Sequence, residues 1–306
     1  MRALNNDKSS SLGRGERASR GGFTFIELLV VIFVIALLAA LLAPAMASSG
    51  TDSAAAKCMS NQRQLTAGWQ MYADENRGVF AYNESGGNPP AWVYGNEDYS
   101  GASYNYNTNY LLNPQYAQLG PYVKTATVFK CPSDLSLSGG THGIPRVRSI
   151  SMNAAVGLGA GGLSSEQGAW LPSNYGNDGV EGGPYVCFFK QQDLGRPAPS
   201  ALFLFLEEDA DSINDGSFAF TMPEAAAETH WVDMPAKYHA NANNFSFIDG
   251  HVELHAWRVP QGIPNVAWSG SWSSPPIISS NPDVWWVGTH VSGLVNGHPN
   301  PFPAGN

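Results

Sequence analysis

Residues 21–43 read GGFTFIELLVVIFVIALLAALLA, and this stretch decides the fold of the N-terminal part of the chain. From residue 23 onward it holds one charged side chain, Glu27, and no other charge appears before Asp52. As an α-helix, residues 23–43 would be about 32 Å long, which matches the ~30 Å hydrocarbon core of a bilayer. The sequence therefore predicts a membrane-spanning helix over residues 23–43.

The charges on the two sides of this segment differ in sign. Residues 1–22 carry five basic and two acidic side chains, a net of +3, although the whole chain of 306 residues has a net charge of −9. Because basic residues flank membrane segments on the cytoplasmic side, we expect residues 1–22 in the cytoplasm and the acidic bulk of the chain outside it. That acidic balance argues against nucleic acid as a partner.

Two ordinary explanations of the segment are a plain single-span anchor and a secretory signal peptide. The signal peptide is favoured by Ala45-Met46-Ala47, which offers a cleavage site of the A-x-A kind after a basic leader. Signal peptides usually have an apolar run of only ~7–15 residues, however, and the run here is longer and begins beside Glu27.

A third explanation rests on residues 21–32, where Gly22 and Phe23 precede Glu27 and an unbroken apolar run. This pattern closely resembles the class III signal of type IV pilins and type II secretion pseudopilins. The resemblance implies that a prepilin peptidase cleaves between Gly22 and Phe23 and, as an N-methyltransferase, methylates the new terminal amine. On this interpretation residues 1–22 are a discarded leader, and the apolar helix stays on the mature protein.

The carboxylate of Glu27 is costly on a membrane helix, on the order of 2.5–3.5 kcal/mol at the centre and less near an end. Cleavage before Phe23 would create a partner, because an α-amine has a pKa near ~8 and is mostly cationic at neutral pH. The resemblance implies that Glu27 pairs with this amine between neighbouring subunits and helps to set the register of assembly. The alternative is an unpaired charge at the membrane interface.

We expect the helix to continue outside the membrane over residues 44–78, with a kink or local break at Pro44. Four residues at helical spacing form one stripe that would pack on a folded domain. They are Cys58, Leu65, Trp69 and Tyr72. Gly78 is typical of a helix end.

Beyond Gly78 the helical period gives way to short β-type segments and long loops. The strand candidates are Thr127–Lys130, Val147–Met152, Tyr185–Lys190, Ala201–Leu206, Phe218–Thr221, Asn244–Ile248 and Val252–Val259. Asp249-Gly250 between the last two predicts a hairpin with a type I′ turn. The expected class is α+β: a long N-terminal helix on an antiparallel sheet head over residues 79–259, with an irregular Pro/Gly-rich extension over 260–306.

A second resemblance covers most of the chain through residue 258. Its internal segments are residues 58–76, 129–134 and 148–153. With His239 and Asp249-Gly250 in an H-x9-D-G arrangement, they look like the large pseudopilin-like proteins of planctomycete and verrucomicrobial type. For His239 and Asp249 we expect structural hydrogen bonds to the loop and to the turn at Gly250. No nucleophile motif accompanies them, so no catalytic role is expected.

Cys58, Cys131 and Cys187 form an odd-numbered set in a region expected in an oxidising compartment. A Cys58–Cys131 disulfide would link the helix to the loop-rich region and would add about 4 kcal/mol by the chain-entropy argument. Three small buried hydrophobic side chains are an equally good explanation. No C-x-x-C pair occurs, which argues against zinc binding and redox catalysis.

An acidic stretch over residues 207–216 is the best candidate for an ion site, because calcium prefers hard oxygen ligands. Its tentative calcium ligands are Asp209, Asp211, Asn214 and Asp215. The spacing matches an EF-hand only in part, since Ile213 stands where an Asp or Asn is needed. Some pseudopilins hold calcium in a loop of the sheet, which favours this assignment by resemblance. A solvated acidic turn is the alternative.

These features together predict a structural pilin-like subunit and not an enzyme. The resemblance implies assembly into a type II secretion pseudopilus or a type IV pilus-like fibre. Its expected partners are the prepilin peptidase, other pilin-like subunits, the inner-membrane assembly platform and membrane lipid. The subunit would cross the inner membrane once, with its head periplasmic or extracellular. The alternative is a binding module that recognises a polysaccharide or a surface partner and uses the apolar segment only as an anchor.

Overall fold

The computed structural model of the protein describes residues 24–83, 90–139, 143–157, 184–222, 231–270, 281–295 and 301, without the side chains of residues 38–52. The chain forms two compact units, Met1–Ser48 and Ser49–Asn306, which we describe separately. One helix, α1 (Phe25–Glu75), has residues in both units. We refer to the second unit as the head.

In the first unit, α1 begins at Phe25, and its helical backbone continues through Pro44 without the local break expected there. The helix contains Leu, Ile, Val and Ala in long runs; Ala and Leu have high helix propensity, and the β-branched Ile and Val have a lower one. Within the described residues, no helix is both long and apolar enough to cross a membrane. The predicted span over residues 23–43 includes positions outside the described side chains and stays a prediction.

The head contains a five-stranded sheet with the strand order β3-β1-β2-β4-β5. The strands are β1 (Ile150–Asn153), β2 (Phe203–Glu207), β3 (Ser217–Phe218), β4 (Ala242–Phe247) and β5 (Val252–Ala256). All pairings are antiparallel except β1 with β3, which is parallel. The expected all-antiparallel sheet is therefore wrong: the loop after β2 carries the chain past β1, so that β3 runs opposite to β2 and parallel to β1. The class is α+β, as predicted.

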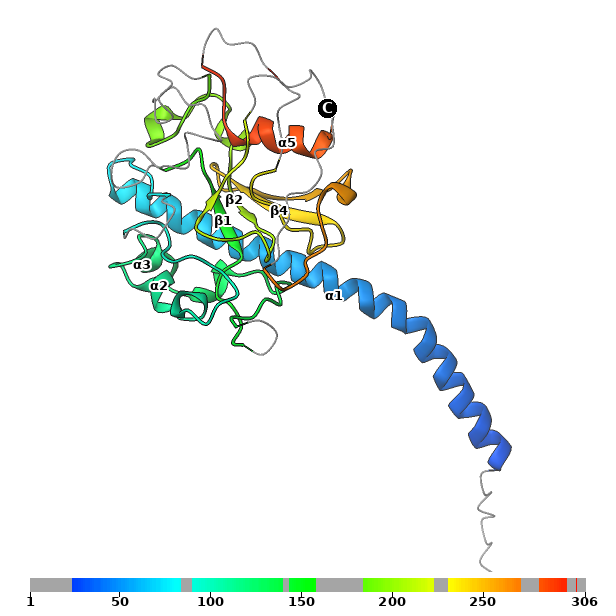
Figure 1. Cartoon of the computed structure of the whole chain (residues 1–306). Helices are drawn as coiled ribbons and strands as arrows, with labels where there is room; N and C mark the ends of the chain where they lie inside the picture. The colour runs from blue at the N-terminus through cyan, green and yellow to red at the C-terminus, as the bar shows by residue number, and fades with distance from the viewer. Residues whose placement is uncertain are drawn as a thin grey trace, which may run out of the picture. The chain divides into compact units, whose positions relative to one another are not determined.

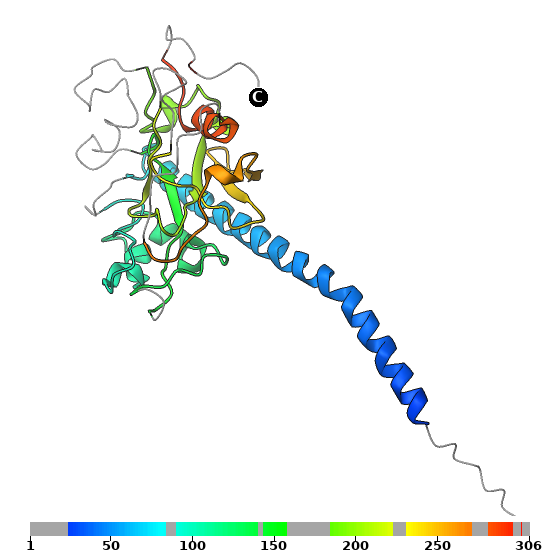
Figure 2. The same ribbon diagram turned by 45° about the vertical axis from the view of Figure 1, so that its right-hand side comes forward.

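Two helices cover opposite faces of this sheet, as Figures 1 and 2 show for the head part of α1 and for α5 (Pro282–Val291). On one face, Gln62 of α1 donates from Nε2 to the backbone carbonyl of Asn244 in β4, at 2.8 Å. On the other face, the rings of Trp286 in α5 and Phe245 in β4 have centroids 4.9 Å apart. The Asn244 side chain lies on the α1 face, where it donates to Glu207 near Cys58 of α1, and Phe245 points to the opposite face because side chains alternate along a strand.

The predicted stripe on α1 lies in the core. Cys58, Leu65 and Trp69 are almost completely buried, and Tyr72 is partly buried. The helix ends at Glu75, where Gly78 has a φ of +81° and donates its N–H to the carbonyl of Ala73 at 2.8 Å. This bond spans five residues and marks a Schellman motif, in which the left-handed residue that ends the helix is Arg77, with a φ of +60°, and Gly78 follows it.

The hairpin between β4 and β5 differs in detail from the predicted turn. A type I′ turn needs positive φ at both central residues, but in the described turn only Gly250 has one, at +97°. Phe247 pairs with His251, and Gly250 donates its N–H to the carbonyl of Phe247 at 2.9 Å. The loop therefore has three residues and ends in a left-handed glycine, which is the next most common hairpin geometry.

Two predicted strands and part of the predicted tail have other structures. Residues 126–129 form a 3₁₀ helix, and the described residues of 185–190 make only isolated bridges. The extension over 260–306, predicted irregular, contains α5, which begins where the Asn281 side chain accepts the N–H of Asp283 and Pro282 fills the first turn. The remaining short helices are η1 (Ser103–Asn105), α2 (Asn109–Leu112), α3 (Gly120–Val123), η2 (Ala126–Phe129), η4 (Gln191–Asp193), η5 (Pro199–Ala201) and η7 (Pro260–Gly262).

Candidate functional site

The first described residues form a reciprocal cap at the start of α1. Thr24 donates from its backbone N–H and from its hydroxyl to Glu27 Oε2, both at 2.8 Å. The backbone N–H of Glu27 points back to Thr24 Oγ1 at 3.3 Å. This T-x-x-E arrangement is a capping box, which satisfies N–H groups that a helix start leaves without partners. Gly22 and Phe23, the residues of the predicted cleavage site, lie outside the described part of the chain.

Residues 25–37 of α1 present apolar side chains in every direction. Every large hydrophobic side chain from Phe25 to Leu37 is exposed, from 45% at Val34 to 77% at Phe25. We call this segment the apolar helix surface. A helix that is apolar all round normally lies inside a protein core or a membrane, and soluble proteins rarely expose so continuous a patch. A surface of this kind is typical of a helix that lies against lipid or against other apolar helices.

A disulfide joins α1 to the segment after η2 in the head. It links Cys58 and Cys131, whose Cα atoms are 5.3 Å apart. The third cysteine, Cys187, is buried and lies outside this pair. The bridge closes a loop of 73 residues in the sequence, so it restricts the unfolded chain strongly.

Two buried ionisable side chains lie against this disulfide. His239 Nε2 is 3.4 Å from Cys131 Sγ and 3.2 Å from Glu207 Oε2. Glu207 also accepts a hydrogen bond from Asn244 Nδ2 at 2.9 Å. The sequence led us to expect hydrogen bonds from His239 and Asp249 to the loop and the turn. Asp249 lies in the hairpin turn, where Oδ1 accepts from the backbone N–H and from the ring of His251.

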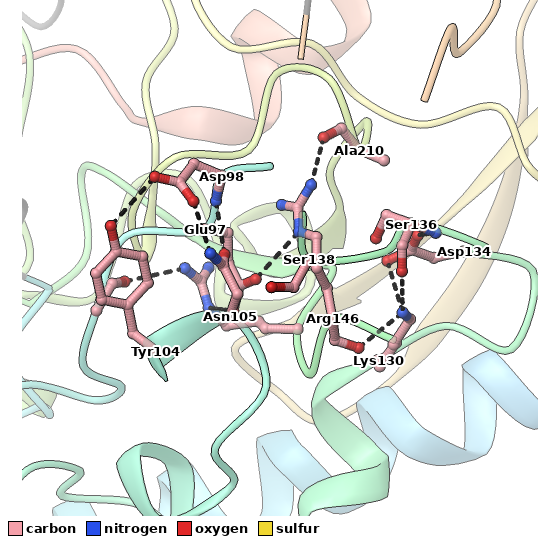
Figure 3. A network of polar contacts seen from close by, with 12 residues as sticks. Glu97, Asp98, Tyr104, Asn105, Lys130, Asp134, Ser136, Ser138, Arg146 and Ala210 are labelled. Atoms are coloured by element: carbon pink, nitrogen blue, oxygen red, sulfur yellow. Dashed lines mark hydrogen bonds and ion pairs between the residues drawn. The ribbon is translucent and has the colours of Figure 1, made fainter. Parts of the chain in front are cut away.

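A second buried polar network lies between η1 and residues 146–148, which precede β1 (Figure 3). Arg146 donates from Nε to Glu97 Oε2 at 3.2 Å and from Nη1 to the carbonyl of Ala210 at 2.8 Å. Arg148 Nε is 3.9 Å from the other Glu97 oxygen. Burial raises the pKa of Glu97 to about 7, while the guanidinium groups of Arg148 and Arg146 oppose this rise.

The four tentative calcium ligands bind different stretches of backbone. Asp211 accepts the N–H groups of residues 267–270, and these donors hold its pKa below the ordinary value although burial raises it. Asp209 accepts from the N–H of Asp211, Asn214 from that of Asp215, and Asp215 from that of Ser217. These bonds fix the loop itself, and calcium binding there stays a prediction.

Residues 17–43 match the prokaryotic N-terminal methylation motif. The match includes the capping box and the apolar helix surface, and it supports a type IV pilin-like prepilin that is a substrate of prepilin peptidase. The match ends before His239 and Asp249-Gly250, so the second resemblance stays a prediction. The chain has no significant match among curated proteins or solved structures.

Sequence reasoning missed the neighbourhood of Cys131, Glu207 and His239. The residues come from segments that are up to about 100 positions apart, and no local spacing connects them. The only available signal was the pair of adjacent acidic residues, Glu207 and Glu208, at the end of an apolar strand, which is an unusual place for buried charge.

Proposed function

We propose that the protein is a structural pilin-type subunit that is cut after Gly22, methylated on Phe23 and assembled through α1 into a type II secretion pseudopilus or a type IV pilus-like fibre. The observation that carries this proposal is the apolar helix surface within the matched methylation motif. Exposed apolar side chains around a whole helix are stable only against lipid or against the same helices of other subunits.

The proposed partner of the apolar helix surface changes during the life of the subunit. Before assembly, residues 23–43 would lie in the inner membrane, with the leader 1–22 in the cytoplasm and the head outside. During assembly, helices of neighbouring subunits would replace lipid around the same side chains. The assembly role of Glu27 follows from this exchange, because its carboxylate needs a cationic partner away from water.

Mass spectrometry of the mature N-terminus tests this proposal. Protein recovered from membranes of a cell that has a prepilin peptidase should begin at an N-methylated Phe23. The variant Gly22→Ala, with Gly21→Ala as the matched control, should keep the leader because the cut follows Gly22. A mature chain that begins at Ser48 would identify a conventional signal peptide, and an unprocessed Met1 would identify a plain anchor; either result contradicts the proposal.

A further inference from the structure

A compact group of metal-ligating side chains lies in the head, separate from the assembly segment. It consists of Cys58 in α1, Cys131 after η2, Glu207 at the end of β2 and His239 before β4. One ligand atom from each residue lies within 4.8 Å of all the others, and all four residues are buried. Within the described residues, it is the only such group of three or more His, Cys, Asp or Glu side chains.

The ligand distances agree with a tetrahedral site on the histidine and carboxylate side. Zinc bonds of ~2.0–2.3 Å place neighbouring ligand atoms about 3.3–3.8 Å apart in a tetrahedron. His239 Nε2 is 3.4 Å from Cys131 Sγ and 3.2 Å from Glu207 Oε2. The two sulfur atoms are joined in the disulfide, so they must separate before both can bind a metal.

Hydrogen bonds from neighbouring residues hold Glu207 and Cys131 in place, as is usual around a metal site. Asn244 donates from Nδ2 to Glu207 Oε1 at 2.9 Å and from its backbone N–H to Oε2 at 3.4 Å, and both carboxylate oxygens lie within 3.3 Å of His239 Nε2. The backbone N–H of Ser133 points at Cys131 Sγ at 3.4 Å, the kind of contact that stabilises a thiolate. The ring nitrogen of His239 that faces Cys131 and Glu207 is Nε2, and this atom would bind the metal. Nδ1 is buried and has no hydrogen-bond partner among the described residues, unlike in most metal-bound histidines.

We propose that this group binds one zinc ion whenever Cys58 and Cys131 are thiols. The head would then be cross-linked at the same place in both redox states, by a disulfide or by a zinc ion. Two thiolates, one imidazole and one carboxylate suit zinc, whereas calcium and magnesium prefer oxygen ligands alone. Four protein ligands and complete burial fit a structural site without an open catalytic position.

The two states exchange through a balanced reaction. A phosphine reductant breaks the S–S bond, supplies two electrons and becomes a phosphine oxide with oxygen from water, which also provides the two thiol protons. Zinc binding then releases these two protons to solvent. A disulfide oxidant reverses the change: it accepts two electrons, the S–S bond forms and Zn²⁺ leaves. A pocket of about 440 Å³ is lined by Lys57, Asn61, Lys130 and Cys131 among others.

The test uses the purified full chain in two redox states. After phosphine reduction, addition of zinc chloride and desalting, elemental analysis should find about one zinc per chain, as a single four-ligand site requires. The oxidised protein should retain none. Cobalt(II) in the reduced protein should give thiolate charge-transfer absorption. Reduced wild-type protein that binds no zinc, or oxidised protein that binds as much as the reduced form, overturns the proposal.

Variants identify the ligands. His239→Ala and Glu207→Gln should each weaken zinc binding at least tenfold in the reduced protein, and His239→Ala should also change the cobalt spectrum. His251→Ala, at a histidine outside the group, and Cys187→Ser should retain the wild-type zinc content. Equal zinc binding by His239→Ala and His251→Ala contradicts the assignment.

Melting of the wild-type protein provides a test that needs no variant. Zinc should raise the melting temperature of the reduced protein and leave that of the oxidised protein unchanged, because only thiols offer the complete ligand set. Reduced protein that unfolds and is not refolded by zinc also overturns the proposal. Neither result depends on N-terminal processing, so this inference and the proposed function fail independently.

Discussion

Glu27 has one observed interaction and one proposed interaction, and single substitutions can separate them. In the precursor its carboxylate completes the capping box with Thr24. In the mature subunit the proposed partner is the terminal amine of Phe23, which exists only after cleavage. The first interaction needs an acceptor oxygen, and the second needs a negative charge, so the two roles have different chemical requirements.

Thr24→Ala and Glu27→Gln distinguish these roles. Thr24→Ala removes the side-chain cap but keeps the charge, whereas Glu27→Gln keeps a side chain that is suited to a capping box but removes the charge. We expect Thr24→Ala to assemble into filaments at near wild-type yield and Glu27→Gln to lose most of them. Both variants should still be cut after Gly22. Loss of filaments in Thr24→Ala with normal assembly of Glu27→Gln would assign Glu27 to capping instead.

At the scale of elements, the sequence predicted the helices and strands in which buried and exposed positions alternate with a regular period. The stripe on α1 follows the helical period, and the β4–β5 hairpin follows the strand period around Gly250, so both were found. The run at residues 127–130 is rich in strand formers, yet most of it lies in η2, and no strand in the described part of the chain pairs with it. Helix α5 had a start signal in Asn281-Pro282-Asp283 that the surrounding prolines concealed.

The candidate sites also differ in whether they are local in the sequence. The methylation motif is a continuous stretch and could be read directly, whereas the Cys131, Glu207 and His239 neighbourhood exists only after the sheet has formed. The parallel pairing of β3 with β1 is also a long-range feature, because it depends on where the loop after β2 crosses. Local sequence patterns do not predict such long-range contacts.

The glycine of the hairpin provides a prediction at the same scale. Gly250→Ala should destabilise the head by roughly 1–2 kcal/mol, because an L-residue is strained at a φ of +97°. A clash is not the reason, since an added Cβ would meet only the end of the Gln70 side chain, whose nearest atom is Nε2 at 3.4 Å. Chemical denaturation measures this effect, and Gly101→Ala, where an added Cβ meets nothing within 4 Å, is the control. Equal stability of the two variants would contradict the argument from backbone strain.

At the scale of the whole molecule, the head encloses an unusual amount of buried acid. Glu97, Glu208 and Asp209 all lie in its interior, and burial raises the pKa of each of them, to about 7 for Glu97 and Asp209. Most proteins lose stability in acid because their carboxylates are held ionised. Here the native state retains protons that the unfolded chain has already released, so the dependence has the opposite sign over part of the pH range.

We therefore expect the free energy of unfolding to fall as the pH rises from about 4.5 to about 7, the range between the ordinary and the raised pKa of Glu97. Each extra proton held by the native state contributes a slope of about 1.4 kcal/mol per pH unit. Glu97→Gln keeps an oxygen acceptor for Arg146 but cannot titrate, so urea unfolding at several pH values should show a flatter slope. Asp74→Asn, at an exposed carboxylate, should retain the wild-type slope. If Glu97→Gln retains it too, the two arginines keep Glu97 ionised throughout this range, and burial does not decide its charge.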